Sequence, residues 1–296
     1  NRASSVTVVQ LEPLYPLTVL NNLTLQSGIF DANSLNITIG GNFTVSSGTT
    51  YTTGTNATIL NGAVAQTFTV DLAAPLSLNM FKIDKPVGTT VTFAGTQKTI
   101  NVNDNFWLIL GNLADNGNTI NMAKDVYNSG IHSGTGKIVL NTAAQVQSIN
   151  GNGIFQNLEL NNANAAVAPV SLIANTTING VLTFSQDKLF NIGIYNLRLN
   201  SSASILNAGA NRYIQTSGTL GDGGITSVYS SSTAFVFPLG AASTSHAVPA
   251  YTPASIGFTG TPTYGSITVN PVGYEHPTTT SNGRSLTYFW RVKSTG

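Results

Sequence analysis

The chain has 296 residues, of which 41% are hydrophobic and only 8% are charged, against a usual charged fraction of roughly 25%. Twelve Lys and Arg residues against eleven Asp and Glu residues leave a formal net charge of +1, so there is no strong field to attract nucleic acid or an anionic membrane. Cysteine is absent, which excludes disulfides, Cys-ligated metal sites and thiol nucleophiles. Because the net charge is close to zero, we predict no nucleic-acid partner.

The polar residues are mostly Asn, Ser and Thr, with 29 Gly, a composition typical of proteins outside the cell. No stretch reaches the roughly 18 consecutive apolar residues that cross a bilayer, so we predict no membrane insertion. The chain begins Asn1-Arg2-Ala3, with neither an initiator Met nor an apolar signal region. We expect a piece of a longer protein or a processed mature form.

Residues 17–218 consist of short runs in which apolar and polar residues alternate, each closed by Gly, Asn, Ser or Asp. This period of two predicts β-strands. Clear examples are Leu35–Ile39, Phe43–Val45, Thr99–Val102, Trp107–Leu110, Lys137–Leu140 and Asn196–Leu199.

Degenerate repeats run through this region. The segments 23–37 and 182–198 place apolar residues at similar offsets, and a weaker copy begins at residue 157. Repeats of about 20 to 30 residues are typical of solenoids, in which each coil buries its apolar side chains by stacking on the next. We predict an all-β fold with a parallel β-helix over residues 1–218. A pair of antiparallel β-sandwiches remains an alternative, because its strand spacing is similar.

The sequence pattern changes after residue 218, where Gly221–Gly224 and Ser230–Ser232 indicate a junction between two modules. We predict that residues 219–296 form a small β-sandwich-like module. Its strands are expected at residues 234–240, 254–258, 265–269 and 286–292, and the module is expected to be truncated.

The apolar runs and motifs of this second module occur in a recognisable order: Phe235–Gly240, Tyr251–Ile256, Ile267–Val269, His276-Pro277 and Leu286–Val292. In this order the module resembles a segment of large secreted cell-surface proteins of Bacteroidota. The resemblance implies cargo of the type IX secretion system and an adhesive role, as in the adhesins of gliding motility. It also implies further domains of the same chain and surface or secretion components as partners. The sorting domain of that family is not seen in the sequence, and its O-glycosylation signal, Asp followed by Ser or Thr, does not occur.

Catalytic chemistry on carbohydrates needs positioned carboxylates, and the chain holds only three Glu and eight Asp. Asp104, Asp115 and Asp125 are the nearest to a cluster, with Lys124 beside the last. Their spacing of about ten residues could place them on neighbouring corners of a solenoid. We interpret them as solvent-exposed residues that cap turns, and we predict no catalytic residues.

Metal ligands are also sparse. His132, His246 and His276 lie far apart in the sequence and are expected at the surface or in turns. The run Gly134-Thr135-Gly136-Lys137 lacks the spacing of a phosphate-binding loop and is expected to be a turn. We predict no metal site and no cofactor, with calcium left open because Gly221-Asp222-Gly223-Gly224 partly resembles a calcium-binding repeat.

Aromatic side chains raise the question of glycan binding. Tyr51, Trp107 and Trp290 would suit sugar rings if exposed, but both Trp residues lie within apolar runs and are expected in the core. The threonine-rich segment 49–53 raises ice binding, which we rank lower because no Thr-x-Thr recurs at a fixed interval. Six N-glycosylation sequons are attributed to the Asn and Thr content and begin at Asn22, Asn36, Asn42, Asn56, Asn175 and Asn200.

These observations predict a non-enzymatic extracellular stalk or adhesive segment of a large bacterial surface protein. The alternative is a β-helix that cleaves or binds polysaccharide, for which an exposed aromatic strip would be the distinguishing feature of a binding module. The specific ligand does not follow from the sequence.

Overall fold

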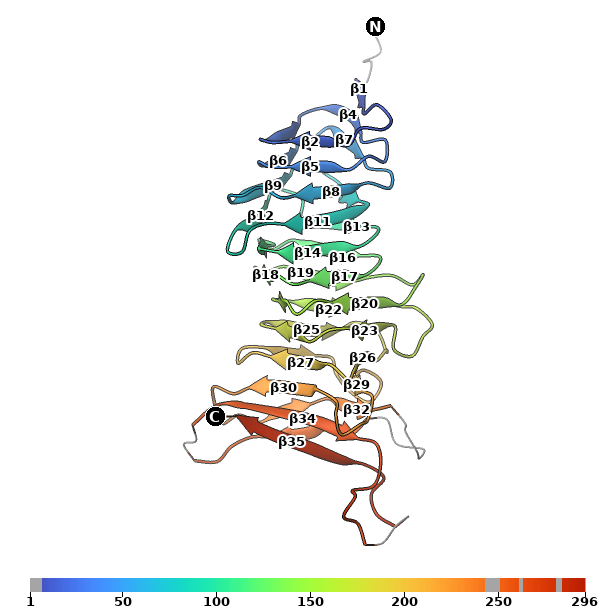
Figure 1. The fold of residues 1–296 in the computed structure, drawn as a ribbon, viewed down its shortest axis with the longest axis vertical. Helices are drawn as coiled ribbons and strands as arrows, with labels where there is room; N and C mark the ends of the chain where they lie inside the picture. Colours follow the sequence, from blue (N-terminus) through green and yellow to red (C-terminus); the bar gives the residue numbers. More distant parts are fainter. Residues whose placement is uncertain (1–6, 243–250, 261–262, 281–283, 296) are drawn as a thin grey trace. The chain divides into compact units, whose positions relative to one another are not determined.

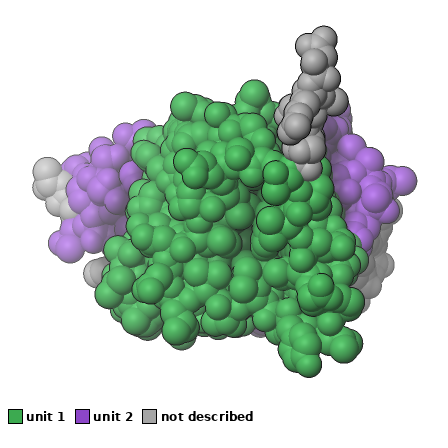
Figure 2. Space-filling view, turned by 90° about the horizontal axis from the view of Figure 1, so that it is seen from above, with its two compact units in different colours: residues 1–141 green, residues 142–296 purple. Residues whose placement is uncertain are grey.

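The computed structural model describes residues 7–242, 251–260, 263–280 and 284–295, and every regular element in them is a β-strand (Figure 1). Stacked parallel strands form a β-solenoid of about ten turns, which confirms the predicted all-β, parallel β-helical fold. The chain divides into two compact units, residues 1–141 and 142–296, coloured separately in Figure 2. No helix that could span a membrane is found in the described part of the chain.

Unit 1 contains three sheets that the chain visits in turn, here named 1A, 1B and 1C. Sheet 1A comprises β2 (Leu17–Val19), β5 (Ile37–Ile39), β8 (Ala57–Leu60), β11 (Met80–Asp84), β14 (Phe106–Leu110) and β17 (Val126–Asn128). Sheet 1B comprises β3 (Leu23–Leu25), β6 (Phe43–Val45), β9 (Gln66–Val70), β12 (Thr90–Ala94), β15 (Asn112–Ala114) and β18 (Ile131–Ser133). Sheet 1C comprises β10 (Leu76–Leu78), β13 (Thr99–Val102), β16 (Thr119–Met122) and β19 (Lys137–Leu140). A further parallel sheet is formed by β1 (Val8–Gln10), β4 (Gly28–Asp31) and β7 (Thr49–Thr52).

The register explains why the repeats are hard to see in the sequence. Phe43 pairs with Phe68, 25 residues later, whereas Ile120 pairs with Ile138, 18 residues later. The strands keep their alternation of buried and outward side chains, as in the buried Phe43 and Val45 around the half-buried Thr44. The variation in coil length therefore falls in the corners and not in the strands.

Phenylalanines form the centre of the unit 1 core. The rings of Phe43 and Phe68 stack with their centroids 5.0 Å apart, and Phe93 contacts Phe68 edge-on at 5.3 Å. Phe81 and Phe106 of sheet 1A stack at 5.7 Å. All five side chains are buried, so successive coils are joined by apolar contact as well as by strand pairing.

Asparagine side chains at the corners bridge one coil to the next. The Asn22 Oδ1 atom accepts a hydrogen bond of 2.7 Å from the backbone N–H of Asn42, and Asn42 Oδ1 accepts one of 2.8 Å from Thr67. The same contact, from a side-chain Oδ1 to a backbone N–H about one coil later, recurs at Asn36, Asn105, Asn157 and Asn175. These asparagine bridges satisfy backbone donors where strand pairing stops.

A buried lysine supports another corner of unit 1. Lys85 is 1% exposed, and its Nζ donates to Gly62 O at 2.6 Å, Val64 O at 2.7 Å and Gln66 Oε1 at 2.7 Å. Burial lowers the pKa of Lys85 to about 8. The ammonium group thus links three oxygens of the preceding coil.

Unit 2 repeats the arrangement in sheets named 2A, 2B and 2C. Sheet 2A comprises β20 (Gln147–Asn150), β23 (Val170–Leu172), β26 (Phe190–Gly193), β29 (Ile214–Thr216) and β32 (Leu239–Ala241). Sheet 2B comprises β21 (Ile154–Phe155), β24 (Thr176–Ile178), β27 (Asn196–Leu199), β30 (Gly224–Val228), β34 (Ser266–Val272) and β35 (Phe289–Thr295). Sheet 2C comprises β22 (Leu158–Leu160), β25 (Val181–Phe184) and β28 (Ser204–Leu206). β31 (Phe235–Phe237) and β33 (Ala254–Ile256) form a separate antiparallel pair.

The structure differs from the expected boundary between residues 218 and 219. Parallel pairing continues past it, because β30 pairs with β27 and β32 pairs with β29. The later strands lie near their predicted positions, but β34 pairs antiparallel with β30, and β35 with β34, which extends sheet 2B. The segment Gly221–Gly224 is a corner and not a linker: Asp222 is buried there and its carboxylate accepts from Thr219 N and Oγ1.

Candidate functional site

Asp115 and His132 form a buried pair in unit 1. Their side chains are both fully buried, and His132 Nε2 lies 2.8 Å from Asp115 Oδ2. The backbone N–H groups of Gly117 and Gly136 donate to Asp115 Oδ1 at 2.9 and 2.7 Å. Burial alone raises the pKa of the Asp115 carboxyl, but the hydrogen bonds from His132, Gly117 and Gly136 outweigh it and hold the pKa below its usual value.

Local backbone conformation builds this pair. Gly134 has a φ of +115°, and a Cβ atom there would lie 2.2 Å from Asp115 Oδ1. Only glycine allows that approach, so residues 134–136 form a turn, as predicted, whereas Lys137 already begins β19; the N–H of Gly136 also donates to the carboxylate. The predictions that Asp115 is solvent-exposed and that His132 lies at the surface or in a turn are wrong. Both side chains are fully buried, which their hydrogen bond to each other makes possible.

The other predicted acids lie at a corner of unit 1. Asp104 Oδ2 is 2.8 Å from Lys124 Nζ, one coil later, and both side chains are partly exposed. The backbone N–H of Asp125 donates to Asn105 Oδ1 at 3.1 Å. Buried Asp115 is therefore not available to a substrate beside Asp104, and the three carboxylates do not form one accessible cluster.

The remaining candidate ligands do not come together. His276 is exposed and its Nδ1 is 2.8 Å from Thr278 Oγ1, as expected of a turn residue, whereas His246 lies outside the described residues. Among residues whose placement is described, no group of three His, Cys, Asp or Glu could hold a metal ion.

The aromatic candidates differ from expectation. Trp107 and Trp290 are 37% and 38% exposed, so the prediction that both lie in the core is wrong. On β14 the neighbours Phe106 and Leu108 point inward, which forces Trp107 outward. Trp107 pairs with Tyr127 on the next coil, and Tyr51 is buried.

Strand pairing also aligns a short row of threonines, here called the threonine rank. The row is not visible in the sequence because the coils differ in length. Thr24, Thr44 and Thr69 are successive partners across sheet 1B, and Ala94 ends the rank. The rank spans three coils only.

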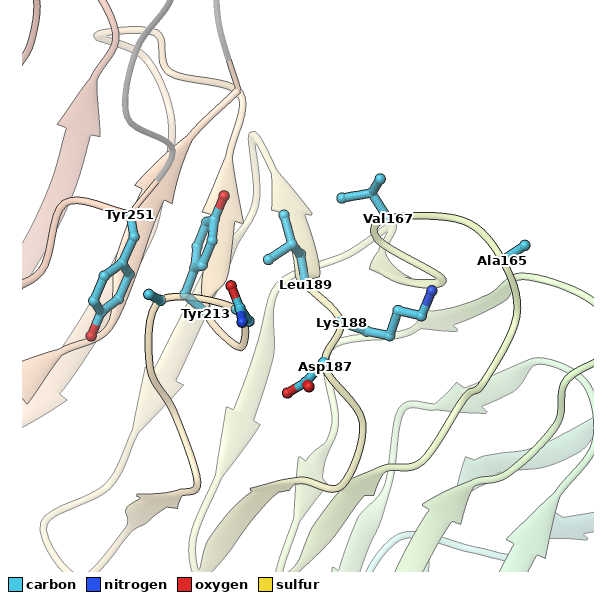
Figure 3. Close-up of a pocket in the computed structure, with 9 residues that line it drawn as sticks. Ala165, Val167, Asp187, Lys188, Leu189, Tyr213 and Tyr251 are labelled. Carbon is cyan, nitrogen blue, oxygen red and sulfur yellow. The ribbon is translucent and has the colours of Figure 1, made fainter.

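A pocket of about 730 Å³ lies on unit 2, at the corners where the chain enters sheet 2A (Figure 3). Three consecutive corners and one later residue line it. The lining residues are Ala165, Val167, Asp187, Lys188, Leu189, Ala210, Asn211, Tyr213 and Tyr251. Two of them are tyrosines, whose rings contact each other with centroids 5.5 Å apart.

Hydrogen bonds fix the corners that carry this pocket. Leu189 N donates to Val167 O at 3.0 Å, and Phe190 N donates to Tyr213 O at 3.0 Å. Thr252 N, beside Tyr251, donates to Leu239 O at 2.7 Å. The sequence analysis missed this site, because its residues come from separate coils and no local motif links them.

Comparison of the chain with protein-family models, with curated proteins and with solved structures found no match.

Proposed function

We propose that this chain is a non-enzymatic structural and adhesive segment of a large protein on the bacterial cell surface. The asparagine bridges support this most directly. They place a polar side chain of one coil on the backbone of the next at six positions in the two units. Such contacts use neutral groups, which explains how a chain with 8% charged residues forms long hydrogen-bonded stacks.

The hydrogen bonds of the charged residues also support a structural role. The Asp115 carboxylate is hydrogen-bonded to His132 and to two backbone N–H groups. The Lys85 ammonium group donates to three oxygens, and the Asp222 carboxylate accepts from Thr219. Groups held in this manner stabilise corners instead of facing a substrate. The proposed extracellular setting and type IX export rest on composition and on the resemblance of residues 235–292.

Labelling of intact cells tests this proposal. Antibodies against the chain should bind unpermeabilised cells of the organism that makes it, and protease added outside should remove the signal. A strain lacking the segment should attach less well to surfaces while growing normally. Detection only after lysis would contradict the surface location, and unchanged attachment would contradict the adhesive role.

A glycan-binding or carbohydrate-active β-helix is the second candidate, and the outward pair Trp107 and Tyr127 favours the binding form. The two residues are paired on adjacent coils of sheet 1A and point outward, an arrangement that suits stacking on sugar rings. Trp107→Ala should abolish retention on an insoluble polysaccharide that the native chain binds, whereas Trp290→Ala should not. Equal retention of Trp107→Ala and the native chain would remove this candidate.

A further inference from the structure

We propose that the unit 2 pocket binds a carboxylate-bearing sugar, such as a uronic-acid unit of an acidic glycan. The inference deepens the adhesive part of the proposed function and rests on it. Three features of the pocket carry it: one available ammonium group, one tyrosine in its wall, and an aliphatic surface between them (Figure 3).

Lys188 supplies the positive charge. Its half-buried side chain donates one hydrogen bond, Nζ to Ala166 O at 3.1 Å, which holds the ammonium group in place and leaves further N–H directions for a ligand. Asp187 also lines the pocket, and its carboxylate is paired with Arg212, which lies beside the pocket and does not line it, at 2.5 Å between Oδ1 and Nε. Because Arg212 offsets the charge of Asp187, the charge of Lys188 is left uncompensated, in a chain where charge is scarce.

Tyr213 supplies a neutral hydrogen-bonding group. The residue is 2% exposed, yet its hydroxyl has no hydrogen-bond partner among the described residues. The hydroxyl oxygen itself is not enclosed, so a ligand that enters the pocket can take the place of the water bonded to it. A sugar hydroxyl can both donate to and accept from this group.

The surface between these two groups is aliphatic. In Figure 3, Leu189 lies between Tyr213 and Lys188, with Val167 nearby on the facing loop. The C–H face of a pyranose can pack on Leu189 and Val167 while its carboxylate contacts Lys188 and a hydroxyl contacts Tyr213. Because backbone hydrogen bonds fix these loops, little ordering is needed on binding.

Titration calorimetry on the full chain tests this inference. The probes are oligogalacturonate, its methyl ester, which keeps the ring but loses the charge, and a sulfated dextran oligosaccharide. We expect oligogalacturonate to bind at least about tenfold more tightly than its methyl ester, and raised salt to weaken its binding. Lys188→Met should lose most of this preference, and Tyr213→Phe should weaken binding of both galacturonate probes by about tenfold.

Two variants of unit 2 serve as matched controls. Lys293→Met removes an exposed lysine on β35, and Tyr195→Phe removes a hydroxyl at another corner; both should bind like the native chain. Thermal unfolding of each variant separates loss of the site from loss of the fold. Absence of oligogalacturonate binding, equal binding of the methyl ester, or binding of sulfated dextran alone would overturn the inference. Those outcomes would leave the surface labelling and attachment results of the proposed function unaffected.

Discussion

At the residue scale, the few charged groups stabilise corners of the coils. Asp115 and Lys85 show this most clearly, because each is buried and each contacts at least three polar partners. A buried charge is tolerated only when its hydrogen bonds replace those of water. Removing either side chain leaves buried polar atoms without a partner.

Replacement of Asp115 by Ala should lower the free energy of unfolding by about 3 kcal/mol at pH 7, since His132 and two backbone N–H groups lose their acceptor. The folded-state pKa of Asp115 lies below the unfolded value of about 3.9, so its contribution is complete above that pH and is lost as the pH falls through the folded pKa. Urea unfolding of the native chain and the variant between pH 7 and pH 2 should therefore converge at the acid end. A constant difference at every pH would contradict the assigned role.

The lowered pKa of Lys85 predicts a change in the free energy of unfolding at alkaline pH. Its folded pKa of about 8 lies below the unfolded value of about 10.4, so the unfolded state binds more protons between these two values. Burial disfavours the ammonium form in the folded state even though it has three acceptors, so the Lys85 contribution to the free energy of unfolding should rise from pH 8 to pH 10 as this cost is relieved. Denaturation of the native chain and Lys85→Met at both pH values measures this difference, and a rise of equal size in the variant would contradict it.

At the element scale, short strands provide the apolar interior and asparagine bridges join the corners. Alternation along the sequence predicted the strands well, because inward Leu, Ile, Val and Phe recur at every second residue. It did not settle which single residues face outward. Trp107 belongs to an unbroken apolar run, and only the position of the strand on its neighbours decides that it is exposed.

The bridges make a specific prediction. Asn42→Ala removes the acceptor for Thr67 N, which is the bridge from Asn42 to the next coil, and should lower the free energy of unfolding by about 1 kcal/mol. Asn21→Ala, at an exposed corner residue one coil earlier, should change it by less than about 0.5 kcal/mol. Equal effects of the two substitutions in chemical denaturation would show that the bridge is not stabilising.

At the scale of the whole molecule, the sequence predicted a parallel β-helix but placed the change of architecture too early. Glycine-rich residues 221–224 suggested a linker, whereas parallel pairing continues through β30 and β32. Pairing between residues far apart along the chain cannot be read from composition. The same reason hid the unit 2 pocket, whose Tyr213 and Tyr251 meet only after the coils have stacked.

We propose that this solenoid is structural and adhesive and does not cleave glycans. The most direct test incubates the chain with soluble and insoluble polysaccharides and measures both retention and newly formed reducing or unsaturated ends. We predict retention on acidic polysaccharides and no new ends at any pH between 5 and 9. New ends that disappear in the variant carrying Asp104→Asn and Asp125→Asn would contradict the claim and identify the exposed acidic corner as an active site.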